Sequence, residues 1–446
     1  MVRPIGVDLF SGAGGLSLGF EQAGFDVRAA VEIDPIHAAI HKYNFPDCAV
    51  LPRSVVGLTA EEIRSAAGLS SSDKVDVVFG GPPCQGFSMI GHRSMEDPRN
   101  RLVHEFVRIV AELDATYFVF ENVKGLTVGR HKAFLEELVQ AFDKAGYAVR
   151  TPWQVFDAAQ FGVPQHRQRL ILVGAKKSVA IPAYPDPITA PADAKISSGL
   201  PKGPTAAEAL GDLPDADQFA VLAGTDKVDG VRYGKPSRYA EEMRCLTNDG
   251  WHHGYPRDWP TGSLTSSWQT EHTDISRLRF SETRPGETEP ISRFYKLAAD
   301  GLSNTLRAGT DGARGAFTSP RPIHYQHNRC VTVREMARLH GFPDWFRFHS
   351  TKWHGARQIG NAVPPPFARA IAGAVMEATG RTPTKPSQAL ALGDERLLYM
   401  TLSEAANHLG IDAPNSKRDQ RSGAKKRTQH ETEAARLAAM SGLTDG

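Results

Sequence analysis

Short apolar segments alternate with amphipathic segments over the first 175 residues, and this alternation limits the fold more than any other feature of the sequence. One such segment, Tyr117–Phe120, is apolar at every position, as expected of a strand buried on both faces of a parallel sheet. Between these segments apolar residues recur at helical spacing, as at Leu102, Phe106, Ile109 and Leu113. The pattern predicts βαβ units of the α/β class, with strands at Ile5–Phe10, Val27–Ile33, Val75–Phe79, Tyr117–Phe120 and Leu170–Val173.

The size and composition of the chain limit its number of domains and its cellular compartment. At about 150 residues per domain, 446 residues suggest roughly three structural units, or one large domain with a substantial insertion. The sequence has no run of about 18 uncharged apolar residues and begins without the apolar core of a signal peptide, so we expect a cytoplasmic protein with no membrane span. The four cysteines, none in a CxxC pair, fit a reducing compartment. The chain has 52 basic and 50 acidic residues, so its net charge is close to zero. A polyanionic partner would therefore have to bind a local basic patch.

The composition changes near Lys176. Residues 176–327 are rich in Pro, Gly, Ser and Thr but carry scattered aromatic residues, so we expect a loop-rich domain with a small core of its own. Helical periodicity returns at Val333–His340 and Phe367–Val375. From about Arg381 onward we expect a solvated extension with a basic run at 415–427. An alternative remains open, in which residues 400–411 form half of a helix-turn-helix and help to hold phosphates.

A glycine-rich turn follows the first predicted strand. Gly12, Gly14 and Gly15 allow a ligand to approach the backbone, and Glu32 lies 20 residues after Gly12 at the end of the next strand. A carboxylate at this spacing binds the hydroxyls of a ribose. The turn lacks the G-x-G-x-x-G spacing of dinucleotide-binding proteins, so we predict another nucleoside-containing ligand.

Three further groups follow or flank predicted strands. Cys84 lies in the loop GGPPCQGFS at the carboxyl end of a strand, where a thiolate is placed to act as a nucleophile. Glu121 leaves an apolar strand and can donate a proton or a hydrogen bond. Arg167 and Arg169 enter a strand at alternate positions, and forked guanidiniums suit a phosphate or a carbonyl oxygen. Because strand ends share one edge of a sheet, we expect these groups to converge on one cleft.

Seven segments, in this order, resemble the motifs of the DNA (cytosine-5) methyltransferase family: DLFSGAGG, VEID, GGPPCQGFS, ENVKGL, FGVPQHRQRLILVG, TVREMARLHGFPD and QIGNAVPP. The resemblance covers Ile5 to Gly174 and Ser303 to about Glu377, and PPCQGFS together with ENV is highly specific. The family's fold is a Rossmann-like sheet that binds S-adenosylmethionine, joined to a smaller target-recognition domain. The resemblance therefore implies a catalytic and cofactor-binding domain at 1–175, a recognition domain at 176–327, a segment completing the catalytic domain at 328–380, and an extension at 381–446.

The resemblance also implies a role for each matching residue. Cys84 would add to C6 of a cytosine, Glu121 would give a proton or hydrogen bond to N3, and Arg169 would hold O2 with Arg167 nearby. The base must first be flipped out, because C6 cannot be attacked within the stacked duplex. No metal is implied. The cofactor residues implied are Phe10, Gly12, Gly14, Gly15, Leu16, Glu32 on the ribose, Leu102 and Asn361.

Thr305 and Leu306 match the core of the recognition domain, so polar and aromatic groups between about 230 and 327 would read base edges in the major groove. One departure concerns the third strand, after which the family has an acidic residue for the adenine amino group. Here the segment is Arg53–Val56, in which Ser54 can accept only a weaker bond.

The implied partner is double-stranded DNA with one specific target sequence. We expect a monomeric modification enzyme of a restriction–modification system, whose cognate endonuclease acts on the same site without direct contact. Three alternatives are weighed against this. An NAD-dependent oxidoreductase leaves PPCQGFS, ENV and QIGNAVPP without a role, and a DNA-binding protein without catalysis leaves Cys84 and Glu121 without one. The large recognition insert argues against a transfer-RNA methyltransferase.

Overall fold

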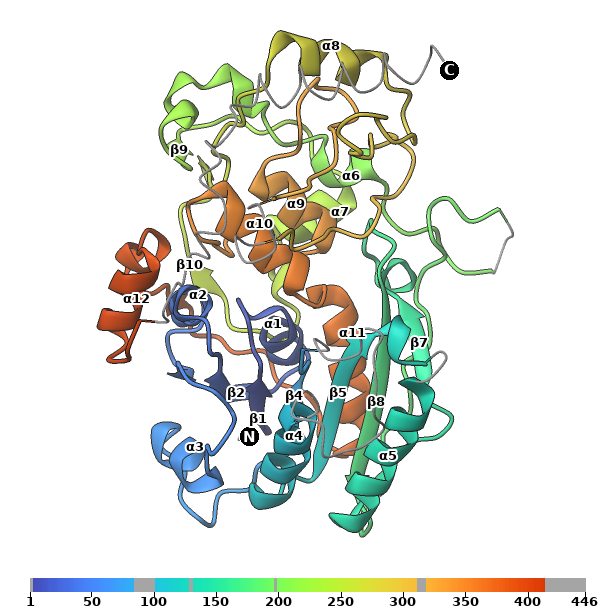
Figure 1. Ribbon diagram of the computed structural model, residues 1–446, viewed down its shortest axis with the longest axis vertical. Helices are drawn as coiled ribbons and strands as arrows, with labels where there is room; N and C mark the ends of the chain where they lie inside the picture. Colours follow the sequence, from blue (N-terminus) through green and yellow to red (C-terminus); the bar gives the residue numbers. More distant parts are fainter. Residues whose placement is uncertain (1–2, 84–100, 128–130, 196–198, 311–317, 414–446) are drawn as a thin grey trace, which may run out of the picture.

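The computed structural model describes residues 3–83, 101–127, 131–195, 199–310 and 318–413 (Figure 1). Cys84 and the basic run at 415–427 lie outside these described residues. No helix in the described part of the chain is long and apolar enough to cross a membrane.

One eight-stranded sheet forms the centre of the lower part of the molecule in Figure 1, in the order β3-β2-β1-β4-β5-β8-β6, with β7 also paired to β8. The first five strands run parallel to one another, which confirms the predicted βαβ pattern. The predicted strand positions are confirmed to within a few residues. The parallel strands are β1 (Ile5–Leu9), β2 (Asp26–Val31), β3 (Ala49–Leu51), β4 (Val77–Gly80) and β5 (Tyr117–Val123).

The last predicted strand, β8 (Gln168–Lys176), differs from a simple parallel arrangement because it runs antiparallel to β5. After β5, helix α5 (His131–Lys144) leads to β6 (Tyr147–Val149) and β7 (Gln154–Asp157), both of which pair antiparallel with β8. The chain then turns and returns as β8 between β5 and β6. As a result, the amino end of β8 lies at the carboxyl end of β5, with Arg169 opposite Val123.

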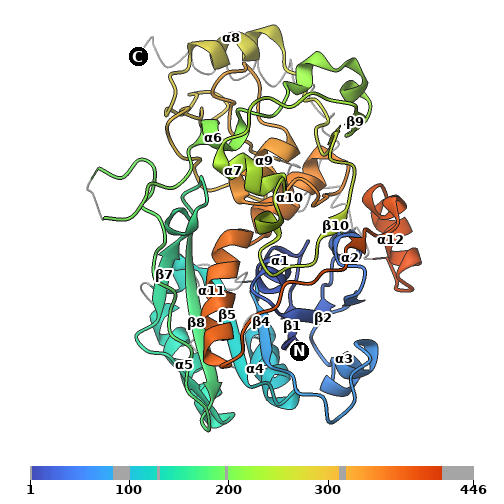
Figure 2. The same ribbon diagram turned by 180° about the vertical axis from the view of Figure 1, so that it is seen from behind.

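Helices cover both faces of the sheet (Figures 1 and 2). On one face α3 (Ala60–Ala66), α4 (Arg101–Glu112) and α5 pack in a core that includes Val78 and Phe106. On the other face α1 (Gly15–Gln22) and α11 (Pro365–Ala378) pack in a core that includes Val77 and Phe79. The alternation of neighbouring β4 side chains between the two cores is the pattern of a strand buried on both faces.

The upper part of the molecule consists of short elements and long irregular segments (Figure 1). Its helices from 176–327 are α6 (Ala206–Leu210), α7 (Arg238–Met243) and α8 (Asp274–Glu282), and β9 (Val228–Asp229) pairs with β11 (Ser263–Leu264). Two helices that come later in the chain, α9 (Val333–His340) and α10 (Lys352–Asn361), also lie there. α11 then returns to the sheet.

Two elements connect the remaining segments. α2 (Pro35–Asn44) follows β2 and begins at Asp34, whose carboxylate accepts the backbone N–H groups of Ile36 and His37. Near the carboxyl end of the described chain, β12 (Leu390–Ala391) pairs with β10 (Arg257–Asp258), and α12 (Leu402–His408) packs beside α2.

Candidate active site

A cavity of about 460 Å³ lies at the carboxyl edge of the parallel strands. The segments that follow β1, β2 and β4, the end of β5 and the end of α10 all contribute to its wall. Its size and position are those of a small-molecule site in an open α/β sheet. The predicted site residues that line it are Phe10, Gly12, Gly15, Leu16, Glu32, Glu121, Arg167, Arg169 and Asn361.

Glu32 is held in place by the glycine turn that it faces. Its Oε2 accepts the backbone N–H of Gly12 at 2.8 Å, and its Oε1 accepts that of Asp34 at 2.8 Å. The side chain is buried, and this burial raises the pKa of the Glu32 carboxyl above its usual range. The carboxyl therefore joins the ends of β1 and β2 in one preorganised wall.

Gly81 and Glu121 show why the loop after β4 must contain glycine. A Cβ atom on Gly81 would lie 2.5 Å from Glu121 Oε2, so only glycine lets this loop approach the carboxylate. The Nε of Arg169 forms an ion pair with Oε1 of Glu121 at 2.7 Å, and both side chains are largely buried. The Nδ2 of Asn122 donates to the carbonyl of Pro82 at 3.1 Å, which ties β5 to the same loop.

Arg167 lies deeper than Arg169 and makes different contacts. Its Nη1 and Nη2 donate to the carbonyls of Leu306 at 3.0 Å and Gly360 at 2.7 Å. Its buried Nε has no hydrogen-bond partner among the described residues. Arg167 therefore joins the segment around Leu306 and the end of α10 to the cavity.

The two residues predicted for DNA recognition lie against the segment that carries Arg167. The Thr305 hydroxyl donates to the carbonyl of His166 at 2.7 Å, and the Leu306 N–H donates to Gln165 Oε1 at 3.0 Å. Thr305 is exposed and Leu306 is buried. A second cavity, of about 560 Å³, opens between Thr305, Val123 and Arg169 and so adjoins the first.

Two residues predicted to bind cofactor are absent from the cavity wall. Gly14 has a φ of 108°, and the ring of Phe45 fills the space where its side chain would lie. Leu102 is half-buried in α4. Ser54 is also absent from the wall, and its hydroxyl oxygen accepts the N–H of Val56. Packing and local turn geometry account for these three positions.

Three polar groups in the cavity wall escaped the sequence-based prediction. Ser11 Oγ, His37 Nε2 and Gln358 Nε2 are buried and have no hydrogen-bond partner among the described residues. Such groups cost free energy unless a ligand or water satisfies them. The Asp34-Pro35 pair is a helix-start signal that could have placed His37 near the strand end, but no signal in the sequence marks Gln358.

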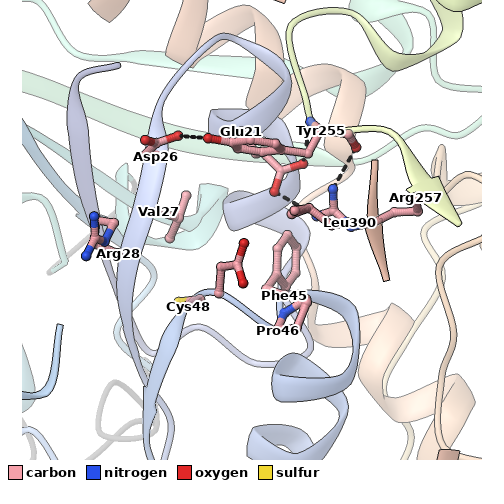
Figure 3. A pocket seen from close by; sticks show the side chains of 11 residues that line it. Glu21, Asp26, Val27, Arg28, Phe45, Pro46, Cys48, Tyr255, Arg257 and Leu390 are labelled. Atoms are coloured by element: carbon pink, nitrogen blue, oxygen red, sulfur yellow. Dashed lines mark hydrogen bonds and ion pairs between the residues drawn. The ribbon is translucent and has the colours of Figure 1, made fainter. Parts of the chain in front are cut away.

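Another cavity, of about 310 Å³, lies on the far side of α1 and is shown in Figure 3. In this cavity Arg257 Nη2 contacts Glu21 Oε2 at 2.8 Å, and the Tyr255 hydroxyl donates to Asp26 Oδ1 at 2.8 Å. These contacts join α1 and β2 to the segment that contains β10.

Comparisons with known proteins agree with this geometry. A model of the C-5 cytosine-specific DNA methylase family matches residues 6–377. The Type II methyltransferase M.XorII of Xanthomonas oryzae pv. oryzae is 54% identical over 413 residues, which are 93% of this chain and 94% of that protein. M1.HphI, a Type II methyltransferase of Haemophilus parahaemolyticus, is 34% identical over 380 residues, 83% of this chain and 86% of that protein.

Solved structures give the same result. One described as a DNA modification methyltransferase encoded within an E. coli prophage has a TM-score of 0.66 and 32% identity, covering 85% of this chain and 100% of that chain. The fold is thus the Rossmann-like α/β fold of these methyltransferases. Since the family model spans most of the sequence, the chain belongs to the C-5 cytosine-specific DNA methylase family.

Proposed function

We propose that this protein transfers a methyl group from S-adenosylmethionine to C5 of a cytosine within a specific sequence of double-stranded DNA. The observation that carries the proposal is the ion pair between Glu121 and Arg169 in the same cavity as the Glu32 turn. The pair is suited to a pyrimidine ring, because an acid and a guanidinium can meet N3 and O2 of one cytosine edge.

The cavity has the groups that S-adenosylmethionine requires. Glu32 offers a buried carboxyl to the ribose hydroxyls. Ser11 Oγ, His37 Nε2 and Gln358 Nε2, which have no partner among the described residues, offer polar atoms to the rest of the cofactor. Phe10, Leu16 and Asn361 complete this part of the wall. When bound, S-adenosylmethionine supplies an electrophilic methyl group. The mechanism needs no metal ion.

The chemistry that the chain itself performs begins at Cys84. Its thiolate forms a bond to C6, and the electrons of the C5–C6 double bond shift so that C5 becomes nucleophilic. Glu121 gives a proton or hydrogen bond to N3, and Arg169 holds O2, so charge on the ring is relieved. After C5 has taken the methyl group, it loses its proton to a base. The double bond then re-forms, and the thiolate leaves C6.

Base flipping supplies the access that this attack requires. Thr305 and the exposed groups near it border the cavity that adjoins Arg169, so the recognition segment 176–327 and the reaction site share one opening. We propose that this segment reads the major groove while the extruded cytosine enters beside Arg169.

A labelling experiment tests the proposal. Tritiated S-adenosylmethionine and duplex DNA from a random library should yield DNA-bound label with wild-type protein and background label with Cys84→Ser. Duplex DNA carrying 5-fluorocytosine at the target should form an adduct stable in denaturing gels, because C5 then has no proton to lose. Label on a residue other than cytosine, or normal transfer by Cys84→Ser, contradicts the proposal.

We further propose that the enzyme is the modification partner of a Type II restriction system and acts as a monomer in the cytoplasm. Support comes from the Xanthomonas and Haemophilus relatives, both of which are Type II methyltransferases. Bisulfite sequencing of DNA from expressing cells should reveal one methylated sequence, and this DNA should resist an endonuclease that cuts there. Methyl transfer to transfer RNA in preference to duplex DNA, measured by competition, would favour the RNA alternative instead.

A further inference from the structure

Residues 390–409 lie beyond the part of the chain that matches the family model, yet they pack closely against the rest of the molecule. After α11 the chain crosses back towards α2 and forms β12, a 3-10 turn at Glu395–Leu398, and α12 (Figure 2). We call residues 390–409 the strap.

The strap contacts α2 along most of that helix. Its Leu397, Leu398 and Ala405 are buried in one apolar cluster with α2 residues, which are Ile36, Ala39, Ile40 and Tyr43. The Gly393 N–H donates to the carbonyl of Tyr43 at 2.9 Å, and a Cβ on Gly393 would lie 2.9 Å from the Tyr43 Cα. The strap therefore lies directly on the α2 backbone.

The opposite side of the same α2 segment faces the cofactor cavity. Asp34 and His37, at the start of α2, line that cavity. Ala13, from the glycine turn, both lines the cavity and belongs to the apolar cluster with the strap. Ala13 thus connects the apolar cluster of the strap to the cavity wall.

A second route runs from the strap to Gln358. The ring Nε2 of His349 donates to the carbonyl of Met400 at 3.0 Å, and the Ser350 N–H donates to that of Leu398 at 2.9 Å. The backbone N–H of His349 in turn donates to Gln358 Oε1 at 3.0 Å. This bond fixes the amide of Gln358, whose unpartnered Nε2 belongs to the cavity wall.

The strap is also tied to the upper part of the molecule. β12 pairs with β10 beside the cavity of Figure 3, where Leu390 lies near Arg257. The Tyr399 hydroxyl donates to Asp226 Oδ1 at 3.2 Å. These contacts hold the strap to the upper part of the molecule at its start and at its middle.

We propose that the strap is a positioning element of the cofactor site: it presses α2 and Gln358 into the arrangement that binds S-adenosylmethionine. The inference rests on the proposed function of the cavity. It assigns a role in cofactor affinity to a segment outside the matched family domain, and none of the strap residues touches the reacting atoms.

The test compares two aspartate substitutions in α12 of the full chain. Ala405→Asp places a charge in the apolar contact with α2, whereas Ser403→Asp, two residues away, lies on the exposed face. Ala405→Asp should raise the Kd and the KM for S-adenosylmethionine at least about tenfold. At saturating cofactor its kcat, and its affinity for duplex DNA, should stay within about threefold of wild type. Ser403→Asp should match wild type throughout.

Limited trypsin digestion at the exposed Arg396 reports release of the strap. A released strap with unchanged cofactor affinity overturns the proposal. So does a loss of kcat, DNA affinity and cofactor affinity in proportion, because that result indicates general destabilisation. If Ala405→Asp does not fold, the milder Leu398→Ala is used for the same test. It should weaken the affinity for S-adenosylmethionine more than the affinity for duplex DNA. Failure of wild-type protein to bind S-adenosylmethionine would instead contradict the proposed function.

Discussion

The sheet and the upper part of the molecule are stabilised in different ways. The sheet is buried between two apolar cores, and its site groups take their places from the ends of strands. The upper part has few regular elements, and several arginine side chains are buried in it among apolar residues. Arg329, Arg334, Arg338 and Arg347 are each no more than 4% exposed.

These arginine side chains supply hydrogen bonds of the kind that neighbouring strands supply to each other in a sheet. Arg334 donates to the carbonyls of Pro343 and Phe346 and to the Thr265 hydroxyl. Arg338 pairs with Asp212 and Asp344, both buried. An irregular segment leaves many backbone carbonyls without partners, and a guanidinium with five donors can satisfy several at once.

The direction of these contacts is informative. All four arginines come from 328–380, and they bind partners such as Asp212, Asp226 and Thr265 in 176–327. The segment that returns to the sheet thus also holds residues 176–327 in place. Changes at the strand ends should therefore affect the rate of methyl transfer, whereas changes in the arginine network should affect the free energy of unfolding.

The largest expected effect is at the strand ends. Glu121→Gln keeps the shape of the side chain but removes the acid, so kcat for methyl transfer should fall about 10²- to 10⁴-fold. The free energy of unfolding should fall by no more than about 1–3 kcal/mol, since one charged hydrogen bond to Arg169 is weakened. Methyl-transfer assays and urea denaturation measure the two quantities. A lower free energy of unfolding with a normal kcat would contradict the expectation that changes at the strand ends affect rate more than stability.

The next effect is in the arginine network. Arg338→Leu leaves the carboxylates of Asp212 and Asp344 buried without their main partner, so the free energy of unfolding should fall by about 3–5 kcal/mol. Arg238→Leu, at an exposed arginine of α7, is the matched control and should change stability by less than about 0.5 kcal/mol. Equal urea midpoints for the two variants would show that the network adds nothing.

The same contrast explains what the sequence could predict. Parallel strands bring their carboxyl ends to one edge, so the convergence of Glu32 and Glu121 followed from their places after apolar runs. Arg169 joins them only because β8 is inserted antiparallel beside β5, and no periodicity specifies strand direction. The cofactor contacts that the motifs imply for Gly14 and Leu102 stay predictions, since both residues also have packing contacts, Gly14 with Phe45 and Leu102 with the core of α4.

The upper part was less predictable for a physical reason. The small core expected in 176–327 is present as two clusters, one with Leu222 and Leu264 and one with Phe280 and Ile323. The aromatic residues Trp251, Trp259 and Tyr295 instead pack at the edge of the main core. Some partners of the buried arginines lie more than 50 residues away in sequence, as Thr265 does from Arg334 and Asp212 from Arg338, and such pairs leave no local pattern. The solvated extension was partly wrong as well, because Leu397, Leu398 and Ala405 are buried against α2.

The two parts should also differ in how pH affects stability. In the sheet, burial raises the pKa of Asp8 to about 8, while its carboxyl accepts the Ser17 hydroxyl. Between pH 4 and 8 the folded protein then holds a proton that the unfolded chain has lost, so stability falls as pH rises through this window. Asp8→Asn should remove this pH dependence of the free energy of unfolding, which is at most roughly 1.4 kcal/mol per pH unit. Urea denaturation at several pH values measures it. An unchanged slope would contradict it.

In the arginine network the sign is opposite. Burial favours the neutral acid of Glu335, but the Arg329 guanidinium, whose two terminal nitrogens each lie 2.8 Å from a carboxylate oxygen, outweighs it and holds the pKa of Glu335 at about 2. The contribution of this ion pair to the free energy of unfolding is fully present above about pH 4.5, the ordinary pKa of the carboxyl. It is lost as the pH falls from about 4.5 towards 2. Glu335→Gln should therefore be less stable than wild type at pH 7, and the difference should shrink below pH 4.

Because Glu335 also accepts the Thr332 N–H at the start of α9, the comparison with Glu335→Ala separates the charge from the helix cap: only the glutamine variant keeps an acceptor there. If the difference between wild type and Glu335→Gln stayed constant from pH 7 to pH 3, the pair with Arg329 would not be what stabilises this part of the molecule.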